Sequence, residues 1–358
     1  MESVTVVGSG AGGMAVSAAI AETGRDVTIC DHPDFPANID AIAARGAVHR
    51  RLRDRDEVES IAVAGATTDI GAAVAGADLV VVVAPLLAHP VLLGAVGDAG
   101  PRLLFVGEGG GALRAVGAGR SPGSVAEFNT LPYLARLESP GQVMVRNKTG
   151  GLFLAAADPA ATPGWMDFAT AAWPWAAAAE DVFDTIIANY NVIDHVPTVL
   201  ANAGYLEGGA GKWHLWGSGC TPSVARAIQA LDDELQRLRL ALGLPRREYA
   251  DCLVAQGFVE RRGEDLHATI HDSVIADVTI ERGPAFLEFR FITEDVPHGL
   301  VLIESIGRAY GVDLPVVGAL ITFTSMLLGR DTRAGGTTLA TLGLPETGAE
   351  LDEVLNRQ

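Results

Sequence analysis

The stretch VTVVGSGAGGMAVSAAIA, residues 4–21, decides the fold of the first part of this chain. A short β-branched run opens it, an alanine-rich segment typical of a helix closes it, and Gly8, Gly10 and Gly13 lie between. Gly8 permits a tight turn, Gly10 removes a side chain that would hold a phosphate away from the backbone, and Gly13 lets the helix pack closely on the strand. A strand that turns this way into a helix directs unpaired amides at solvent, where a pyrophosphate can bind.

A second strand, DVTIC at residues 26–30, completes a βαβ unit and leads directly to Asp31. A carboxylate at this position accepts hydrogen bonds from the ribose hydroxyls of an adenosine and repels a 2′-phosphate, which favours NAD over NADP. FAD shares the glycine pattern, but its usual further contact regions are not evident, so it ranks below the nicotinamide cofactors. Besides Gly8, Gly10, Gly13 and Asp31, we expect cofactor contacts from Ser9, Ala11, Met14, Ala84 and Pro85.

Composition excludes several classes of partner. About half of the 358 residues are apolar, as in an ordered globular protein, and the formal net charge of −18 repels nucleic acid and anionic lipid. The longest apolar run, residues 79–88, is too short to cross a membrane. Cys30, Cys220 and Cys252 are widely spaced along the chain. Glu2 is acidic at a position where a secretory signal would carry basic residues. We therefore expect a cytoplasmic protein with reduced thiols.

The spacing of apolar segments predicts two domains. Strand-like and helix-like segments alternate up to about residue 160, which is the rhythm of a doubly wound parallel sheet, the Rossmann arrangement. Residues 161–358 are expected to form a mainly α-helical domain. One helix is predicted to begin with Thr221 as its N-cap and Pro222 at its first position, and two more are predicted near residues 300–310 and 316–328.

Two residues of the second half are candidates for proton transfer. His195 lies in an apolar helix-like stretch two residues before Pro197, and a buried structural histidine is the alternative. Asp295 follows the strand-like run RFITE, and a helix N-cap is the alternative. If the two side chains meet, the carboxylate fixes the imidazole tautomer and leaves the other ring nitrogen to move a substrate proton. The spacing alone does not show this contact.

Other candidates carry a weaker signal. His89 follows Pro85 at the expected carboxyl edge of the sheet, where substrates and cofactors bind. Trp213 and Trp216 lie beside a glycine-rich stretch, with core packing as the alternative. His267 and His271 are four residues apart, but no further ligands complete a metal site, so no metal is expected.

Together with the N-terminal glycines, five blocks between residues 127 and 344 resemble the octopine/nopaline dehydrogenase family, the opine dehydrogenases. They are EFNTLPYLAR (127–136), HVPTVLANAGYLE (195–207), TPSVARAIQALDDE (221–234), RFITEDVPHGLV (290–301) and TLATLGL (338–344). The resemblance covers nearly the whole chain.

This resemblance implies a Rossmann domain joined to a helical domain, with the active site in the cleft between them. It implies NAD(P)H-dependent condensation of an amine, such as that of an amino acid, with a 2-oxo acid, followed by reduction of the imine. The His/Asp pair of the family falls on His195 and Asp295. Substrate contacts are expected from His89, Asn129, Trp213 and Arg290, and a homodimer is expected because the family often forms dimers.

Three departures from the family pattern affect the substrate more than the reaction. Gly107, Glu108 and Gly109 replace a proline-glycine turn, His298 replaces an aromatic residue, and Gly336 replaces an arginine. Two rivals stay open: a ketopantoate reductase or β-hydroxyacid dehydrogenase, which needs a helix-borne lysine, and a non-catalytic dinucleotide-binding redox sensor. Lys148 and Lys212 are the only lysines, and both are expected outside helices.

Overall fold

The computed structural model describes residues 2–96, 100–107 and 109–357. Its internal contacts divide the chain into two units, Met1–Thr185 with Leu355–Gln358, and Ile186–Val354. The domain boundary expected at residue 160 lies before this division. The difference arises because helix α6 (Thr162–Ala172) packs against strands β11 (Phe153–Ala156) and β12 (Ala177–Ala178) of the first unit.

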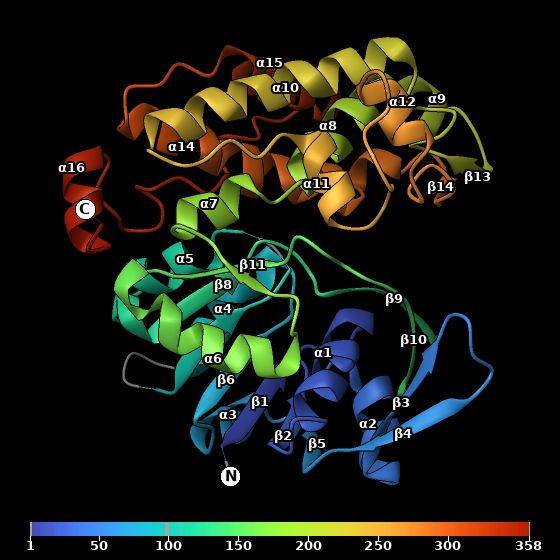
Figure 1. The fold of residues 1–358 in the computed structure, drawn as a ribbon, viewed down its shortest axis with the longest axis vertical. Helices are drawn as coiled ribbons and strands as arrows, with labels where there is room; N and C mark the ends of the chain where they lie inside the picture. The colour runs from blue at the N-terminus through green and yellow to red at the C-terminus, as the bar shows by residue number, and fades with distance from the viewer. Residues whose placement is uncertain (1, 97–99, 108, 358) are drawn as a thin grey trace. The chain divides into compact units, whose positions relative to one another are not determined.

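An eight-stranded sheet in the order β12-β11-β8-β7-β6-β1-β2-β5 forms the centre of the first unit (Figure 1). Its other strands are β1 (Ser3–Val7), β2 (Asp26–Cys30), β5 (Gly65–Thr67), β6 (Leu79–Val82), β7 (Arg102–Phe105) and β8 (Val125–Phe128). Neighbouring strands of this sheet pair in parallel except β8 with β11. The strand order reverses beside β1, which pairs with β2 on one side and β6 on the other. The doubly wound fold is confirmed, and ligands of such sheets bind where the order reverses.

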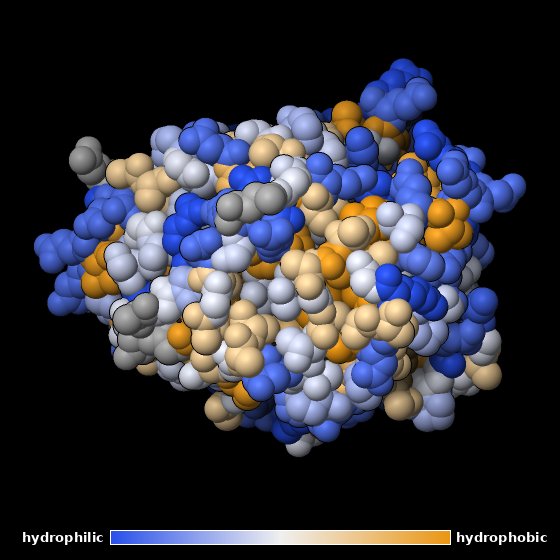
Figure 2. Space-filling model, turned by 90° about the horizontal axis from the view of Figure 1, so that it is seen from below, coloured by the Kyte–Doolittle hydropathy of each residue, from blue (hydrophilic) through white to orange (hydrophobic). Residues whose placement is uncertain are grey.

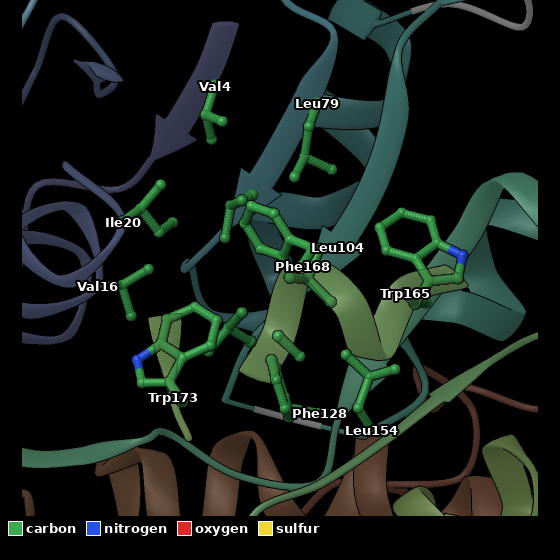
Figure 3. Close-up of a cluster of buried hydrophobic side chains, with 14 of the residues drawn as sticks. Val4, Val16, Ile20, Leu79, Leu104, Phe128, Leu154, Trp165, Phe168 and Trp173 are labelled. Carbon is green, nitrogen blue, oxygen red and sulfur yellow. The ribbon is translucent and has the colours of Figure 1, made fainter. Parts of the chain in front are cut away.

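Helices cover both faces of this sheet. They are α1 (Ala11–Ala21), α2 (Pro36–Arg45), α3 (Ile70–Ala75), α4 (His89–Val96), α5 (Gly111–Gly117) and α6, with short turns η1 (Leu86–Ala88), η2 (Pro122–Ser124) and η3 (Pro159–Ala161). Helix α7 (Val182–Ile187) crosses the division between the two units. On one face, Trp165, Phe168 and Trp173 pack against sheet residues such as Phe128, whose ring meets that of Trp173 edge-on at 5.4 Å (Figure 3). These aromatic residues hold α6 on the sheet.

Helix α1 is buried on nearly every side. A second sheet, in the order β4-β3-β10-β9, contains β3 (Ala47–Leu52), β4 (Val58–Ala62), β9 (Tyr133–Ser139) and β10 (Gln142–Lys148). Met14, Ala15 and Ala18 of α1 pack with Val48 and Val143 of this sheet, while other residues of α1 pack on the central sheet. The alanine-rich composition follows from this position, because small side chains let a helix approach two sheets closely.

Glu127, on β8, is a fully buried acid at the N-terminus of α5. Its Oε2 accepts hydrogen bonds from the N–H groups of Gly110 and Ala112 at 3.0 and 2.9 Å. Its Oε1 accepts a hydrogen bond of 2.7 Å from the hydroxyl of Thr185, which also lies 2.8 Å from the carbonyl oxygen of Val182. Burial raises the pKa of Glu127 to about 7, although its hydrogen bonds act to lower it.

We expect this acid to make the protein less stable as the pH rises. Between about 4.5 and about 7 the folded state retains a proton that the unfolded state has released, so the free energy of unfolding falls across this range and then levels off. The total effect is on the order of 3 kcal/mol. Glu127→Gln retains one donor and one acceptor and should lack this slope. Urea unfolding of both proteins at about pH 5 and about pH 8 checks the difference; a pH-independent gap between them would contradict it.

The second unit is mainly helical, as expected. Its elements are α8 (Asn191–Ala201), α9 (Ala203–Glu207), α10 (Pro222–Ala241), α11 (Tyr249–Ala255), α12 (Leu266–His271), α13 (Arg290–Thr293), α14 (Val301–Ala309), α15 (Pro315–Leu328) and α16 (Gly348–Val354), with η4 (Phe286–Glu288), the π-helical η5 (Asp295–Leu300), and the strand pair β13 (Gly211–His214) and β14 (Thr279–Arg282). The predicted N-cap is confirmed, because the Thr221 side chain accepts a hydrogen bond from the N–H of Val224.

A buried carboxylate connects two of these helices. Glu234 of α10 accepts hydrogen bonds from the N–H groups of Val316 and Val317 at 3.0 and 2.7 Å. These amides open α15, where the helix dipole favours a negative charge. Glu234 thereby fixes α15 against α10, which also contacts α8.

Hydrophilic residues lie mainly toward the edges of the face seen in Figure 2, and apolar residues are mixed with polar ones across its middle. Across the described part of the chain, the helices lack the length or the hydropathy that crossing a membrane requires.

Candidate active site

In the glycine turn between β1 and α1, three glycines matter, and only Gly10 has open space where a side chain would begin. Gly8 has φ +116°, and a Cβ there would lie 2.1 Å from the carbonyl oxygen of Val83. A Cβ on Gly13 would lie 1.7 Å from the carbonyl oxygen of Gly8, so this glycine allows α1 to meet the turn. A Cβ on Gly10 would meet nothing within 4 Å. Gly10 is also the N-cap of α1 and makes no side-chain cap. The open space and the uncapped helix start fit a bound pyrophosphate.

Asp31 lies immediately after β2 and is bonded to this turn. Its Oδ2 accepts hydrogen bonds from the backbone N–H and the hydroxyl of Ser9 at 2.7 and 2.6 Å, and its Oδ1 accepts one from the N–H of His32 at 2.8 Å. The side-chain Nδ2 of Asn38, in α2, donates a hydrogen bond of 2.8 Å to the carbonyl oxygen of Ser9. Asp31 therefore positions the turn in addition to the ribose role expected from sequence, which stays a prediction. Ala11 and Met14 lie in the first turn of α1, as the expected cofactor set requires.

The turn after β6 lies beside the glycine turn, because β1 and β6 are parallel neighbours with Val7 paired to Val82. Ala84 and Pro85 follow this strand and so lie at the same edge of the sheet. His89 opens α4 and is 2% exposed. Its Nε2 lies 3.1 Å from the carbonyl oxygen of Ala84, and its ring packs on Phe105. This geometry gives His89 a part in holding the turn; contact with substrate stays a prediction.

Asn129 is also buried and bridges two segments of the first unit. Its Oδ1 accepts a hydrogen bond from the N–H of Phe153 at 2.8 Å, and its Nδ2 donates to the carbonyl oxygen of Gly151 at 3.2 Å. These bonds fix the end of β8 against the start of β11. Its expected contact with substrate is a prediction that these bonds do not test. Glu108, one of the departures noted in the sequence, lies outside the described residues.

The structure brings His195 and Asp295 together. The His195 Nδ1 lies 2.7 Å from Asp295 Oδ2, although the two residues are 100 positions apart in the chain. The His195 side chain is 12% exposed and that of Asp295 is 3% exposed. Helix α8 carries the imidazole, and Pro197 inside the same helix removes one backbone donor just beyond it. Because Asp295 accepts a hydrogen bond from Nδ1, a neutral imidazole carries its proton on Nδ1. Nε2 is then the ring nitrogen that can accept a second proton.

Asp295 stands at the start of an irregular helix and not after a strand, so the strand-like prediction for RFITE is wrong. Arg290–Thr293 form the helical turn α13, and the π-helical η5 begins at Asp295 and includes Pro297. Widened helical turns of this kind are frequent at functional sites because they redirect a side chain. Asp295 is also not an N-cap, which was the alternative. The N-cap position of η5 is Glu294, whose side chain makes no capping hydrogen bond.

A second carboxylate at the imidazole was missed in the sequence. Asp194 Oδ1 lies 3.8 Å from His195 Nε2, and Asp194 Oδ2 accepts a hydrogen bond from the hydroxyl of Tyr249 at 2.7 Å. Burial raises the pKa of Asp194, and the neighbouring His195 acts to lower it. Burial also raises the pKa of Asp295 well above its usual range, against the charge of Arg290 and with the help of Glu294. Two carboxyl groups thus flank one imidazole.

Aromatic rings cover this pair. The ring of Phe291 stacks on the imidazole with centroids 3.8 Å apart, and Trp216 lies 5.6 Å from it. The tryptophan that meets His195 is therefore Trp216. Trp213, the candidate chosen for substrate binding, lies on β13 and packs on Tyr205 with centroids 4.7 Å apart. Apolar rings around an Asp–His hydrogen bond keep water from competing for it.

The remaining candidates have distinct positions. Arg290 is half-exposed, with Nε 3.6 Å from Glu294, and its charge acts on Asp295. The three cysteines are free and buried. Among the described residues, no group of three or more histidine, cysteine or carboxylate side chains is arranged to hold a metal ion. Lys148 lies on β10 and Lys212 on β13, so both lysines lie on strands.

Comparisons with known proteins agree with this fold. The profile of the family described as NAD/NADP octopine/nopaline dehydrogenase, alpha-helical domain, matches residues 178–328. An opine dehydrogenase of Arthrobacter sp. (strain 1C) is 30% identical over 95% of this chain and 94% of its own length. A solved octopine dehydrogenase with NADH and L-arginine has a TM-score of 0.75 at 19% identity, covering 100% of this chain and 98% of that one. Yersinopine dehydrogenase with NADP⁺ has a TM-score of 0.74 at 15% identity, covering 100% and 99%.

A doubly wound sheet with a dinucleotide turn, joined to a helical unit that holds a buried His–Asp pair, defines a dehydrogenase of the NAD(P)-dependent class. Within that class, the chain belongs to the octopine/nopaline dehydrogenase family, the opine dehydrogenases. The resemblance noted in the sequence is confirmed.

Proposed function

We propose that this protein is an NAD(P)H-dependent opine dehydrogenase that condenses the amine of an amino acid with a 2-oxo acid and reduces the resulting imine. The observation that carries the proposal is the buried hydrogen bond of 2.7 Å between His195 Nδ1 and Asp295 Oδ2, in a chain 30% identical to an opine dehydrogenase over nearly its whole length. The relatives named above act on opines or bind NADH, NADP⁺ or L-arginine, which supports the same class of substrate and cofactor here.

The first unit would hold the cofactor. The glycine turn with Gly10 and the start of α1 would bind the pyrophosphate, Asp31 would bind the adenosine ribose, and Ala84 and Pro85 would border the nicotinamide. A bound dihydronicotinamide supplies the hydride that reduces the imine carbon. NAD is the expected form because Asp31 is acidic, and NADPH should serve less well.

The second unit would move the protons. His195 Nε2 accepts a proton from the substrate ammonium, because only the free amine attacks the carbonyl carbon of the 2-oxo acid. The imidazolium then returns this proton to the hydroxyl of the carbinolamine, which leaves as water and gives the protonated imine that accepts the hydride. Asp295 and Asp194 stabilise the imidazolium between these two steps, as a carboxylate does for the histidine of a catalytic triad. Arg290 is proposed to bind a substrate carboxylate.

The absorbance of NADH tests the proposal directly. Purified protein is mixed with NADH and with a pool of amino acids, a pool of 2-oxo acids, or both. We expect NADH oxidation only when both pools are present, with a secondary amine carrying two carboxylates as the product by mass spectrometry. Oxidation with 2-oxo acids alone would instead indicate a hydroxyacid dehydrogenase or ketopantoate reductase. Absence of oxidation with every pool, together with tight NADH binding, would indicate a non-catalytic redox sensor.

Location and assembly are the remaining parts of the proposal. We propose a cytoplasmic enzyme; the three cysteines, which are free and buried, support this, because thiols stay reduced in that compartment. We propose a homodimer only because members of the family often form dimers. Size-exclusion chromatography with light scattering measures the assembly.

A further inference from the structure

A cavity of about 580 Å³ lies in the first unit, apart from the glycine turn. Its walls come from the C-terminal end of α1, the ends of β3 and β10, and the segment that follows α6; these elements are labelled in Figure 1. The cavity meets α1 at Ala19, Glu22 and Thr23, whereas the dinucleotide turn meets the same helix at Gly10. Because α1 has 11 residues, the two sites are separated by roughly 16 Å of helix. The volume is in the range of small-molecule sites.

The charge of the cavity is opposite to that of the protein. Five cationic side chains and two acidic ones line it, in a chain whose formal net charge is −18. The cations are Arg50, Arg53, Arg55, Arg146 and Lys148, and the acids are Glu22 and Asp54. Arg50 is neutralised by Glu22, which it binds through two hydrogen bonds of 2.7 Å, and by Glu59. The other cations therefore face the cavity with only Asp54 to balance them.

Three of these cations are available to a ligand. Within residues 2–96, 100–107 and 109–357, the side chains of Arg53, Arg55 and Arg146 make no hydrogen bond or ion pair. Arg53 and Arg55 lie on the turn after β3, and Arg146 lies on β10, so they reach the cavity from two neighbouring strands. These guanidinium groups outnumber the one acid among them and repel one another, and each presents a planar set of donors that matches a carboxylate or phosphate.

The fourth cation is held in place by an aromatic wall. Lys148 Nζ lies 4.7 Å from the centroid of the Trp175 ring. Trp175 is itself fixed, because its Nε1 donates a hydrogen bond of 2.9 Å to the carbonyl oxygen of Thr149 and Tyr133 packs edge-on at 5.8 Å. A cation fixed in this way loses little freedom when an anion binds, which favours binding.

We propose that this cavity is a second ligand site, which binds a small organic polyanion carrying two or more phosphate or carboxylate groups. The arginines from β3 and β10 bind separate anionic groups of one molecule, and Lys148 adds a fixed positive charge. The cavity is too small for a nucleic acid duplex or a membrane surface, so the occupant is a metabolite-sized ion. This inference does not depend on the opine dehydrogenase reaction.

Isothermal titration calorimetry of the full-length protein tests the site with two probes, pyrophosphate and citrate. NADH is kept saturating so that pyrophosphate does not enter the glycine turn. The test variant is Arg53→Gln/Arg146→Gln, and the matched control is Arg226→Gln/Arg261→Gln, which removes the same charge from exposed positions of the second unit. We expect at least one probe to bind wild type and control at one site per chain, and the test variant to bind about tenfold more weakly or worse.

The two probes separate the two sources of negative charge. Tighter binding of pyrophosphate indicates a phosphate ester as the natural ligand, and tighter binding of citrate indicates a polycarboxylate. Lys148→Gln is a second variant that should weaken binding in the same direction, and it serves if the double variant does not fold. The proposal is overturned if neither probe binds the wild type, or if both double variants bind equally well. NADH titrations of every variant should be unchanged, which separates this result from the fate of the dehydrogenase proposal.

Discussion

Replacing His195 with alanine should lower kcat for the condensation and reduction by about 10²–10⁴-fold, the contribution of a positioned acid–base group. The expected loss follows from the geometry at Nε2. Asp295 fixes Nδ1 at 2.7 Å and Phe291 stacks on the ring, which leaves Nε2 as the ring nitrogen that can accept a proton. Steady-state rates of NADH oxidation with both substrates measure the effect. NADH affinity should not change, because the residues that would hold the cofactor lie in the first unit.

Two controls separate a chemical role from a structural one. Added imidazole should restore part of the activity of His195→Ala, which it does not do for a misfolded protein. Asp295→Asn keeps the size of the side chain but removes its charge and can reverse the imidazole tautomer, so a loss of up to about 10⁴-fold is expected there too. A His195→Ala protein that turns over at nearly the wild-type rate would end the acid–base assignment.

Replacing Gly10 with alanine should weaken NADH binding by about tenfold to a hundredfold without changing the stability of the protein. The added Cβ meets no protein atom within 4 Å, and the backbone of Gly10, with φ −67°, suits any residue. The same Cβ occupies the space that a pyrophosphate needs next to the amides of α1, and loss of one charge-assisted hydrogen bond accounts for a change of this size. Fluorescence titration with NADH and thermal unfolding of the variant measure the two quantities.

Gly13→Ala is the matched comparison. Its Cβ would lie 1.7 Å from the carbonyl oxygen of Gly8, so the helix and the turn must separate and the protein should be destabilised even without cofactor. The contrast between the two glycines identifies the ligand site. Equal loss of stability in both variants, or full NADH affinity in Gly10→Ala, would contradict a pyrophosphate at this turn.

The parts of the molecule that sequence predicts well are those decided by near neighbours. The turn at Gly8, Gly10 and Gly13 and the cap at Thr221 depend on residues a few positions apart, and both are found as expected. The contact of His195 with Asp295 joins residues 100 positions apart. Spacing does not reveal such a contact, and only the resemblance to a family pointed to it.

The errors and omissions have physical causes. The run Arg290–Thr293 looked like a strand because it is aromatic and β-branched, yet it forms a helical turn, and its own Phe291 packs on the imidazole. Asp194 was overlooked, although a carboxylate next to a histidine in an apolar stretch is a signal that needs an explanation. The position of Trp216 beside His195 was not predicted, because nothing in the local sequence distinguishes a tryptophan on a strand from one on the turn that follows it; the expected contact of Trp213 with substrate stays a prediction.

The bonds between Asp31 and Ser9 have a consequence for redesign of coenzyme preference. Exchanging an acid at this place for a neutral or basic residue is the obvious route toward a phosphorylated coenzyme. Here the same carboxylate accepts both the amide and the hydroxyl proton of Ser9. A single substitution at Asp31 would therefore release the glycine turn as well as change the coenzyme preference. Residues 9 and 31 must be altered together.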